Sequence, residues 1–152
     1  MGGYNSARES FQHGLNIRLN TFGEVHVSTA ESYHSLGNTA RSPGDFASAL
    51  QSYHCAFEII RKHFGEEHPR TAEIYHSIGE VQSSFEDLTS ARQSHQCALN
   101  IRLKVLGEEH HSTAESCQSI GDINVSLKDW KSALQFYQLA LNIRVKAFGE
   151  KD

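Results

Sequence analysis

The chain lacks several features that would assign it to common functional classes. Its 152 residues contain no run of about 18 apolar residues, and its first residues are small and polar, so the sequence predicts neither a membrane span nor a secretory signal. Lysine and arginine together number 14 against 18 aspartates and glutamates, which leaves no basic stripe for binding phosphates. We therefore expect no nucleic-acid partner and no membrane partner.

Cysteine is scarce, and catalytic motifs are missing. The three cysteines have no paired short spacings, so they do not indicate a disulfide framework, and a reducing, cytoplasmic location is favoured. The sequence contains no phosphate-binding loop, no nucleophile elbow and no paired metal motif. We therefore expect neither an enzyme nor a bound cofactor.

What the sequence does contain is an internal repeat with a period of 42 residues. Four glycines mark it, each preceded by Phe or Leu and followed by Glu, at Gly23, Gly65, Gly107 and Gly149. Several other residue types return at the same interval. These are Thr29, Thr71 and Thr113; Gly37, Gly79 and Gly121; and Asp45, Asp87 and Asp129. A period of this length indicates repeated supersecondary units.

Apolar residues at steps of three and four predict two helices in each repeat. The recurring aspartates stand where the second helix needs an N-cap, and the four marker glycines stand where it needs a left-handed C-terminal residue. Two starts are compatible with the first helix. It begins near residue 28, with Ser28 and Glu31 as a capping box, or it begins as in the middle copy, with Pro69 at its first position after the cap His68.

The glycines inside the first helices, Gly37, Gly79 and Gly121, predict close contact between helices. Glycine within a helix costs about 1 kcal/mol relative to alanine, so its return in every copy points to a packing requirement. A single helix hairpin cannot bury both of its apolar faces, and neighbouring hairpins must therefore stack. The expected fold class is all-α, an α-solenoid of antiparallel helix hairpins.

At these residues the sequence resembles the tetratricopeptide repeat, which combines a bulky residue, Leu-Gly, Asp-aromatic and two alanines seven residues apart. The 42-residue length and the phrase Ala-Leu-Asn-Ile-Arg are similar to the extended repeats of kinesin light chains and the nephrocystin group. The resemblance implies a right-handed superhelix. One family position, usually aromatic, is Ala40, Gln82 or Asn124 here.

The repeat register predicts a single array over residues 1–152. Residues 4–22 would form a second helix without its first, and the repeats would follow at 27–64, 69–106 and 111–148. No polar capping helix is visible, so we expect an apolar face to be exposed at each end.

The resemblance also implies where a partner binds, because in this family the first helices form a concave wall. The corresponding positions also lie opposite the apolar stripe of each predicted helix. They are Glu31, His34, Asn38, Glu73, His76, Glu80, Glu115, Gln118 and Asp122. A family site for C-terminal carboxylates would use His34, Asn38, Ser77, Glu115 and Ser119, and only Asn38 fits it.

The first-helix positions suggest a protein-interaction scaffold. The recurring Glu31, Glu73 and Glu115 favour a protein or peptide partner that carries Lys or Arg. The alternative interpretation of these carboxylates is a solvated helix face. A second hypothesis for the whole chain is self-association through its uncapped ends, as the assembly region of a larger protein of the nucleotide-binding signalling type.

The ten histidines do not predict a metal site. Most of them recur with the repeat, and equivalent residues of stacked hairpins lie too far apart to share one ion. His110 and His111 are the one adjacent pair.

Overall fold

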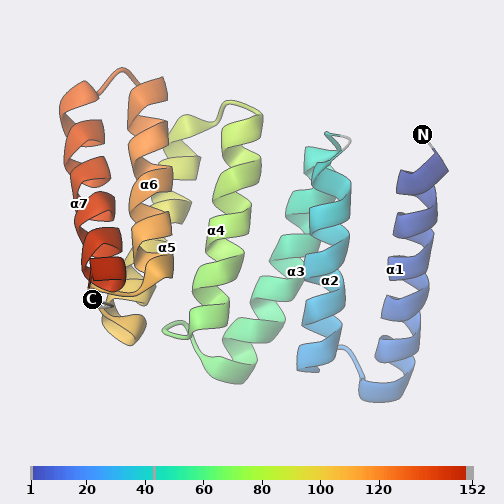
Figure 1. Cartoon of the computed structure of the whole chain (residues 1–152). Helices are drawn as coiled ribbons and strands as arrows, with labels where there is room; N and C mark the ends of the chain where they lie inside the picture. The colour runs from blue at the N-terminus through green and yellow to red at the C-terminus, as the bar shows by residue number, and fades with distance from the viewer. Residues whose placement is uncertain (1, 43, 150–152) are drawn as a thin grey trace. The chain divides into compact units, whose positions relative to one another are not determined.

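The chain folds into α-helices connected by short turns, as shown by a computed structural model that describes residues 2–42 and 44–149 (Figure 1). No β-strand occurs among the described residues, and the predicted all-α fold is confirmed. The helices are α1 Gly2–Phe22, α2 Val27–Arg41, α3 Phe46–Phe64, α4 Pro69–Ser84, α5 Leu88–Leu106, α6 His111–Ser126 and α7 Trp130–Gly149. Over the described ranges, every helix falls short of the apolar length that crossing a bilayer requires.

Backbone contacts group the helices into two compact units. Unit 1 spans Met1–Glu66 and holds α1 to α3, whereas unit 2 spans Glu67–Asp152 and holds α4 to α7. Three pairs pack as hairpins, α2 with α3, α4 with α5, and α6 with α7. Within each unit a second helix also packs on the first helix of the following hairpin, α1 on α2 and α5 on α6.

The second helices begin as their sequence predicts, and three of the four marker glycines end a helix as predicted. Asp45, Asp87 and Asp129 accept hydrogen bonds from backbone N–H groups three residues later, at 3.2, 3.2 and 3.1 Å. The glycines that follow α1, α3 and α5 have φ angles of 85°, 90° and 89°, which a residue with a Cβ rarely adopts. At the fourth marker position, α7 continues through Gly149.

The first helices begin differently from the predicted capping box, and that prediction was wrong. Ser28 lies inside α2, whose N-cap is His26. Nδ1 of His26, His68 and His110 accepts a hydrogen bond from the backbone N–H two residues later, at 3.1, 3.2 and 3.2 Å. The imidazole nitrogen thus does the work of a capping oxygen, and the alternative start at His68 and Pro69 is the one that all three copies use.

A ring on each second helix packs directly against the glycine of its own first helix. A Cβ at Gly37 would lie 2.5 Å from Tyr53 Cε1, and one at Gly121 would lie 2.6 Å from Tyr137 Cε1. In the middle hairpin, a Cβ at Gly79 would lie 2.7 Å from Nε2 of His95. The predicted close approach is confirmed, because each glycine supplies the space that a ring occupies.

Small residues also recur at the helix contacts. The alanines that recur on the second helices are almost fully buried, with at most 3% of their surface exposed. They are Ala49, Ala56, Ala91, Ala98, Ala133 and Ala140. Small side chains at these places let the helices of a hairpin approach closely.

Replacing Gly37 with alanine should destabilise the chain by about 2 kcal/mol, because the new methyl group would overlap the fully buried ring of Tyr53. Urea unfolding followed by circular dichroism measures the loss. Gly14→Ala is the matched control, since Gly14 lies in α1 with no atom within 4 Å of the added carbon. This control should gain stability by about 1 kcal/mol. Equal effects at the two sites would contradict the packing argument.

Candidate partner-binding surface

In unit 1, the three residues expected to face a partner all lie on α2. Glu31 and Asn38 are exposed, whereas His34 is half-buried. The ring of His34 lies 5.4 Å from the ring of Tyr53, and the Tyr53 hydroxyl donates a 2.6 Å hydrogen bond to Asn38 Oδ1. The second helix of the hairpin therefore holds two of these three side chains in place.

In unit 2, the residues expected on α4 are less exposed than those on α2. Glu73 is exposed, and His76 and Glu80 are partly buried. Nε2 of His76 lies 3.7 Å from Oε1 of Glu80, and its ring meets the ring of His95 edge to face at 4.9 Å. Glu73 thus presents the most accessible carboxylate on this helix.

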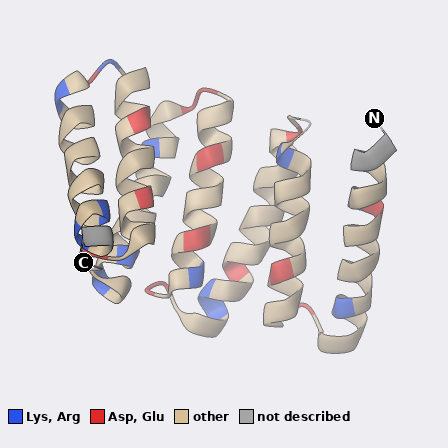
Figure 2. Cartoon of the chain, in the orientation of Figure 1, with Lys and Arg blue, Asp and Glu red and all other residues tan. Residues whose placement is uncertain are grey.

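On α6, the residues Glu115, Gln118 and Asp122 are all exposed, and each contacts a residue of a second helix. Asp122 Oδ1 accepts a 2.6 Å hydrogen bond from the hydroxyl of Tyr137, which raises the pKa of that phenol to about 12. Gln118 Oε1 accepts from Arg144 at 2.5 Å, and Glu115 lies 3.4 Å from Arg102. Acidic residues, marked red on the ribbon of Figure 2, occur along both α4 and α6.

Helical spacing alone therefore overstates the exposure of the expected surface. His34, His76 and Glu80 are partly buried, and the rings at positions 53 and 95 of the second helices contact His34 and His76. The sequence reasoning treated each first helix as if its outward face met only solvent.

The sequence reasoning also missed Arg102, a buried cation beside the acidic residues of unit 2. Its side chain is 6% exposed and donates to the carbonyl of Ser112 at 2.8 Å and to the hydroxyl of Ser116 at 2.9 Å. Burial lowers the pKa of Arg102, while Glu115 and Glu73 oppose that shift. The arginine therefore fastens α5 to α6 and partly neutralises Glu115.

The repeat pattern of the sequence contains a feature that could have predicted the contacts of Arg102. Arg18, 84 residues earlier, donates to the carbonyl of Ser28 at 3.2 Å and to the hydroxyl of Ser32 at 2.6 Å. Both arginines thus precede their two serines by 10 and 14 residues.

The middle hairpin also differs in its buried ring, because His95 replaces the tyrosine of the other two hairpins. His95 is 2% exposed, and its Nδ1 is buried without a hydrogen-bond partner among the described residues. Burial, together with the nearby His76 and Arg102, lowers its pKa to about 3. The imidazole of His95 is therefore neutral over the whole physiological pH range.

Within the described residues, no three histidine, cysteine, aspartate or glutamate side chains converge on a point where they could hold a metal ion. Cys55, Cys97 and Cys117 are free thiols, and burial raises the pKa of Cys117.

Comparison with known protein families identifies the repeat. The model of the tetratricopeptide repeat matches three overlapping stretches, residues 1–59, 44–104 and 85–144. The chain belongs to the tetratricopeptide repeat family. A comparison with curated protein sequences finds no match.

Solved structures with the tetratricopeptide fold are similar to this chain. BtubC (BKLC) from P. vanneervenii is 22% identical with a TM-score of 0.88, and the match covers 95% of this chain and 58% of BtubC. A second structure is that of a kinesin light chain-like protein from Podosopora anserina with nearly identical TPR-like repeats. It is 20% identical with a TM-score of 0.79, and the match covers 97% of this chain and 70% of that protein. The chain therefore spans less than two thirds of the length of BtubC.

The N-terminal domain of stress-induced protein-1 from C. elegans is a more distant example. It is 19% identical with a TM-score of 0.64, over 77% of this chain and 85% of that domain. At these identities the likeness establishes the tetratricopeptide fold and leaves the partner open.

His95 should make this tetratricopeptide chain less stable as the pH falls below about 6.5. The unfolded chain protonates His95 near pH 6.5, whereas the folded chain does so only near pH 3, so acid favours the unfolded state between these values. The unfolding free energy should fall by about 1 kcal/mol per pH unit between pH 6 and pH 4.5. Urea unfolding at a series of pH values measures this slope.

His95→Tyr should flatten the slope, because it restores the ring found in the other two hairpins. His54→Tyr, at an exposed histidine of α3, is the matched control and should leave the slope as it is. A slope that His95→Tyr does not change would rule out the buried imidazole as its cause.

Proposed function

We propose that this tetratricopeptide chain is a non-catalytic, cytoplasmic scaffold that binds a protein or peptide partner on the outward faces of its first helices. The binding residues would be those expected from the sequence on α2, α4 and α6, with preference for a partner that carries Lys or Arg. The observation that supports this proposal best is the charge of α4 and α6.

On these two helices the exposed charge is mainly negative. Helix α6 contains no lysine or arginine, and α4 contains only Arg70, in its first turn. Glu73, Glu115 and Asp122 are exposed on the same helices. A partner's ammonium or guanidinium group would find carboxylate acceptors there and little cationic repulsion.

The contacts within the hairpins rank these carboxylates. Glu115 lies beside Arg102, and Asp122 already accepts the hydroxyl of Tyr137, so each shares its charge with an internal group. Glu73 also interacts electrostatically with Arg102, but less strongly than Glu115 does. We therefore assign the strongest contact with a basic partner to Glu73, with His76 and Glu80 beside it.

Charge reversal at Glu73 tests this assignment. Glu73→Lys should weaken binding of a Lys- and Arg-containing peptide library about tenfold at low salt, because it replaces an attraction with a repulsion. Glu73→Gln should have a smaller effect in the same direction. Fluorescence anisotropy with labelled peptides gives the affinities.

Glu108→Lys is the control for net charge, since Glu108 is exposed in the turn before α6 and changes the charge of unit 2 equally. It should leave the affinity within about twofold. Equal losses of affinity in Glu73→Lys and Glu108→Lys would show that only the overall charge matters. Unchanged affinity in both variants would contradict the acidic binding face.

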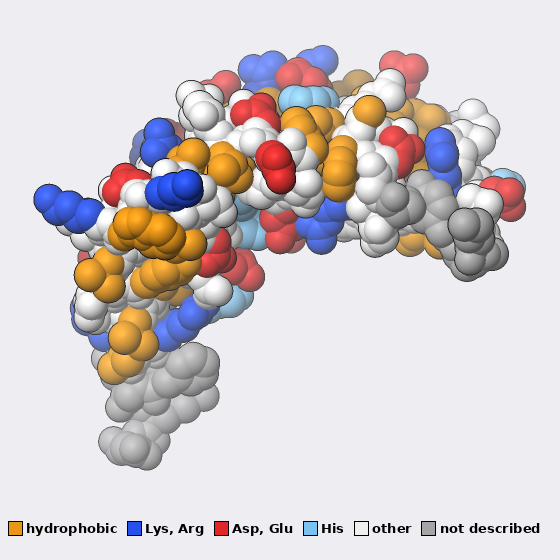
Figure 3. Space-filling view, turned by 90° about the horizontal axis from the view of Figure 1, so that it is seen from above, with side chains coloured by type: hydrophobic (Ala, Val, Ile, Leu, Met, Phe, Trp, Pro, Cys, Tyr) orange, Lys and Arg blue, Asp and Glu red, His pale blue; other side chains and the backbone are white. Residues whose placement is uncertain are grey.

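A second candidate function is self-association, which the outer side of α7 favours. Among the described residues of α7, the most exposed large hydrophobic residues are Trp130, Leu134, Leu141 and Val145, each 55% to 66% exposed. Their spacing of 4, 7 and 4 residues places them on one stripe of the helix. Because this spacing is the same in both chain directions, two antiparallel copies of α7 would place apolar residues opposite each other. Hydrophobic side chains form a cluster on the surface of unit 2 (Figure 3).

Sedimentation velocity over a concentration series tests this second function. We expect a dimer that Leu134→Arg weakens at least about tenfold, since the charge would enter the apolar contact. Leu139→Arg is the matched control on the same helix, because Leu139 lies off the stripe and is 43% exposed. A chain that stays monomeric up to about 100 µM would exclude self-association at cellular concentrations.

A further inference from the structure

Unit 2 contains a pocket on the side of α6 that faces away from the proposed partner-binding face. Residues of α5, α6 and α7 line it, and its volume is about 240 Å³. Its lining residues are Arg92, Gln93, Gln96, Ile120, Asn124, Ser132 and Phe136. Ile120 and Asn124 project from the opposite side of α6 to Gln118 and Asp122, so the pocket is separate from the acidic face.

Asn124 gives this pocket an unused hydrogen-bond acceptor. Its side chain is 2% exposed, and its Oδ1 is buried with no hydrogen-bond partner among the described residues. A buried amide oxygen without a donor is unfavourable, because it has lost its water and gained nothing in exchange. An occupant of the pocket that offers an N–H group would remove this penalty.

The repeat shows how the same position is satisfied elsewhere. In the middle hairpin, Gln82 takes the place of Asn124, and its Oε1 accepts a 2.7 Å hydrogen bond from the Ser94 hydroxyl on α5. The residue equivalent to Ser94 in the last hairpin is Phe136, which has no donor. In the middle hairpin the amide oxygen of Gln82 therefore has a donor within the chain. In the last hairpin the amide oxygen of Asn124 has none within the described ranges and could accept from a bound ligand.

We propose that this pocket binds an extended peptide segment of a protein partner, whose backbone N–H donates to Asn124 Oδ1 while an apolar side chain packs between Ile120 and Phe136. The carbonyl groups of the same segment would face the side-chain amides of Gln93 and Gln96. Peptide groups offer both the donor and the acceptor that this set of amides needs.

The charges at the rim favour an uncharged segment over a free anion. Hydrogen bonds from Ser132 lower the pKa of the Asp129 carboxyl, and the nearby Arg92 lowers it further, so the Arg92 cation already has an anionic neighbour. A free anion would gain little from Arg92 and would be repelled by Asp129.

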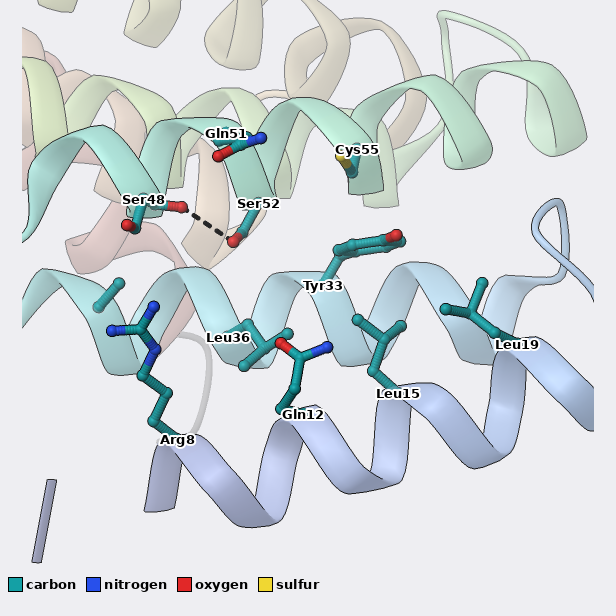
Figure 4. A pocket seen from close by; sticks show the side chains of 11 residues that line it. Arg8, Gln12, Leu15, Leu19, Tyr33, Leu36, Ser48, Gln51, Ser52 and Cys55 are labelled. Atoms are coloured by element: carbon teal, nitrogen blue, oxygen red, sulfur yellow. Dashed lines mark hydrogen bonds between the residues drawn. The ribbon is translucent and has the colours of Figure 1, made fainter. Parts of the chain in front are cut away.

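Unit 1 holds the equivalent pocket without the acceptor (Figure 4). Arg8, Gln12, Leu36 and Ser48 stand 84 residues before their counterparts in unit 2 and line a space of about 310 Å³. Ala40 replaces Asn124 there, so this pocket has no buried amide oxygen to satisfy. Ser52 replaces Phe136 and donates to the carbonyl of Ser48 at 2.9 Å (Figure 4). The unit 1 pocket is therefore a control for the unit 2 pocket within the same chain.

The test uses N-acetyl-leucine methylamide, which carries two peptide groups and one apolar side chain, titrated into the isotopically labelled chain and followed by NMR. We expect saturable shifts at Asn124, Ile120 and Phe136 and none at Ala40 and Leu36. The same compound methylated at both amide nitrogens lacks N–H donors and should bind at least about fivefold more weakly. Absence of saturable shifts in the unit 2 pocket, or equal binding of the two compounds, would overturn the proposal.

Two variants separate binding from folding. Asn124→Leu removes the acceptor and should reduce affinity at least about fivefold, with a melting temperature equal to or above that of the wild type. Asn124→Gln with Phe136→Ser transfers the pair of the middle hairpin and should also lose the probe, because the acceptor is then satisfied internally. Undiminished binding in both variants, or a melting temperature about 10 °C lower for Asn124→Leu, would assign Asn124 a structural role only.

This outcome is independent of the acidic face. Glu73→Lys should leave probe binding unchanged, so either proposal can fail while the other stands. If the shifts instead appeared at Glu115, Gln118 and Asp122, the probe would bind the first-helix face and the pocket proposal would be wrong.

Discussion

The contact between a ring on each second helix and a glycine on its own first helix determines the geometry of every hairpin. Because Gly37, Gly79 and Gly121 have no side chain, the rings at positions 53, 95 and 137 lie directly on the backbone of the first helix. The outward residues of the first helices depend on this contact, since the same rings reach Asn38, His76 and Asp122. Packing inside the hairpin and the chemistry of its surface are therefore coupled.

Differences between the copies, rather than the shared pattern, give each hairpin its own chemistry. The first and last hairpins place a tyrosine hydroxyl on Asn38 or Asp122, whereas the middle one buries a neutral imidazole beside His76. At the next variable position the first helices carry Ala40, Gln82 or Asn124, and the matching position of the second helix carries Ser52, Ser94 or Phe136. The scaffold accepts these exchanges because the glycine and alanine contacts that fix the helices remain the same.

Within each unit, a second helix is joined to the following first helix by polar as well as apolar contacts. Arg18 and Arg102 each span from a second helix to two serines of the following first helix, α2 or α6. A buried arginine is tolerated there because the carbonyl and hydroxyl groups of those serines satisfy its donors. In unit 2 this arrangement also places a cation behind the acidic face, and Glu115 interacts with it more strongly than Glu73 does.

The sequence alone determined the period, the all-α fold, the aspartate and glycine ends of the second helices and the close approach at Gly37, Gly79 and Gly121. These features are set by local rules or by contacts that repeat in register, so one chain displays each of them several times. The histidine caps escaped prediction because serine is the more usual cap and Ser28 stands only two residues beyond His26. Only the tertiary structure decided that Arg102 is buried, that His34 and His76 are half-covered, and that Asn124 Oδ1 lacks a donor. The physical reason is that each of these depends on which group a neighbouring helix, 10 or more residues away in the sequence, brings within about 3 to 5 Å.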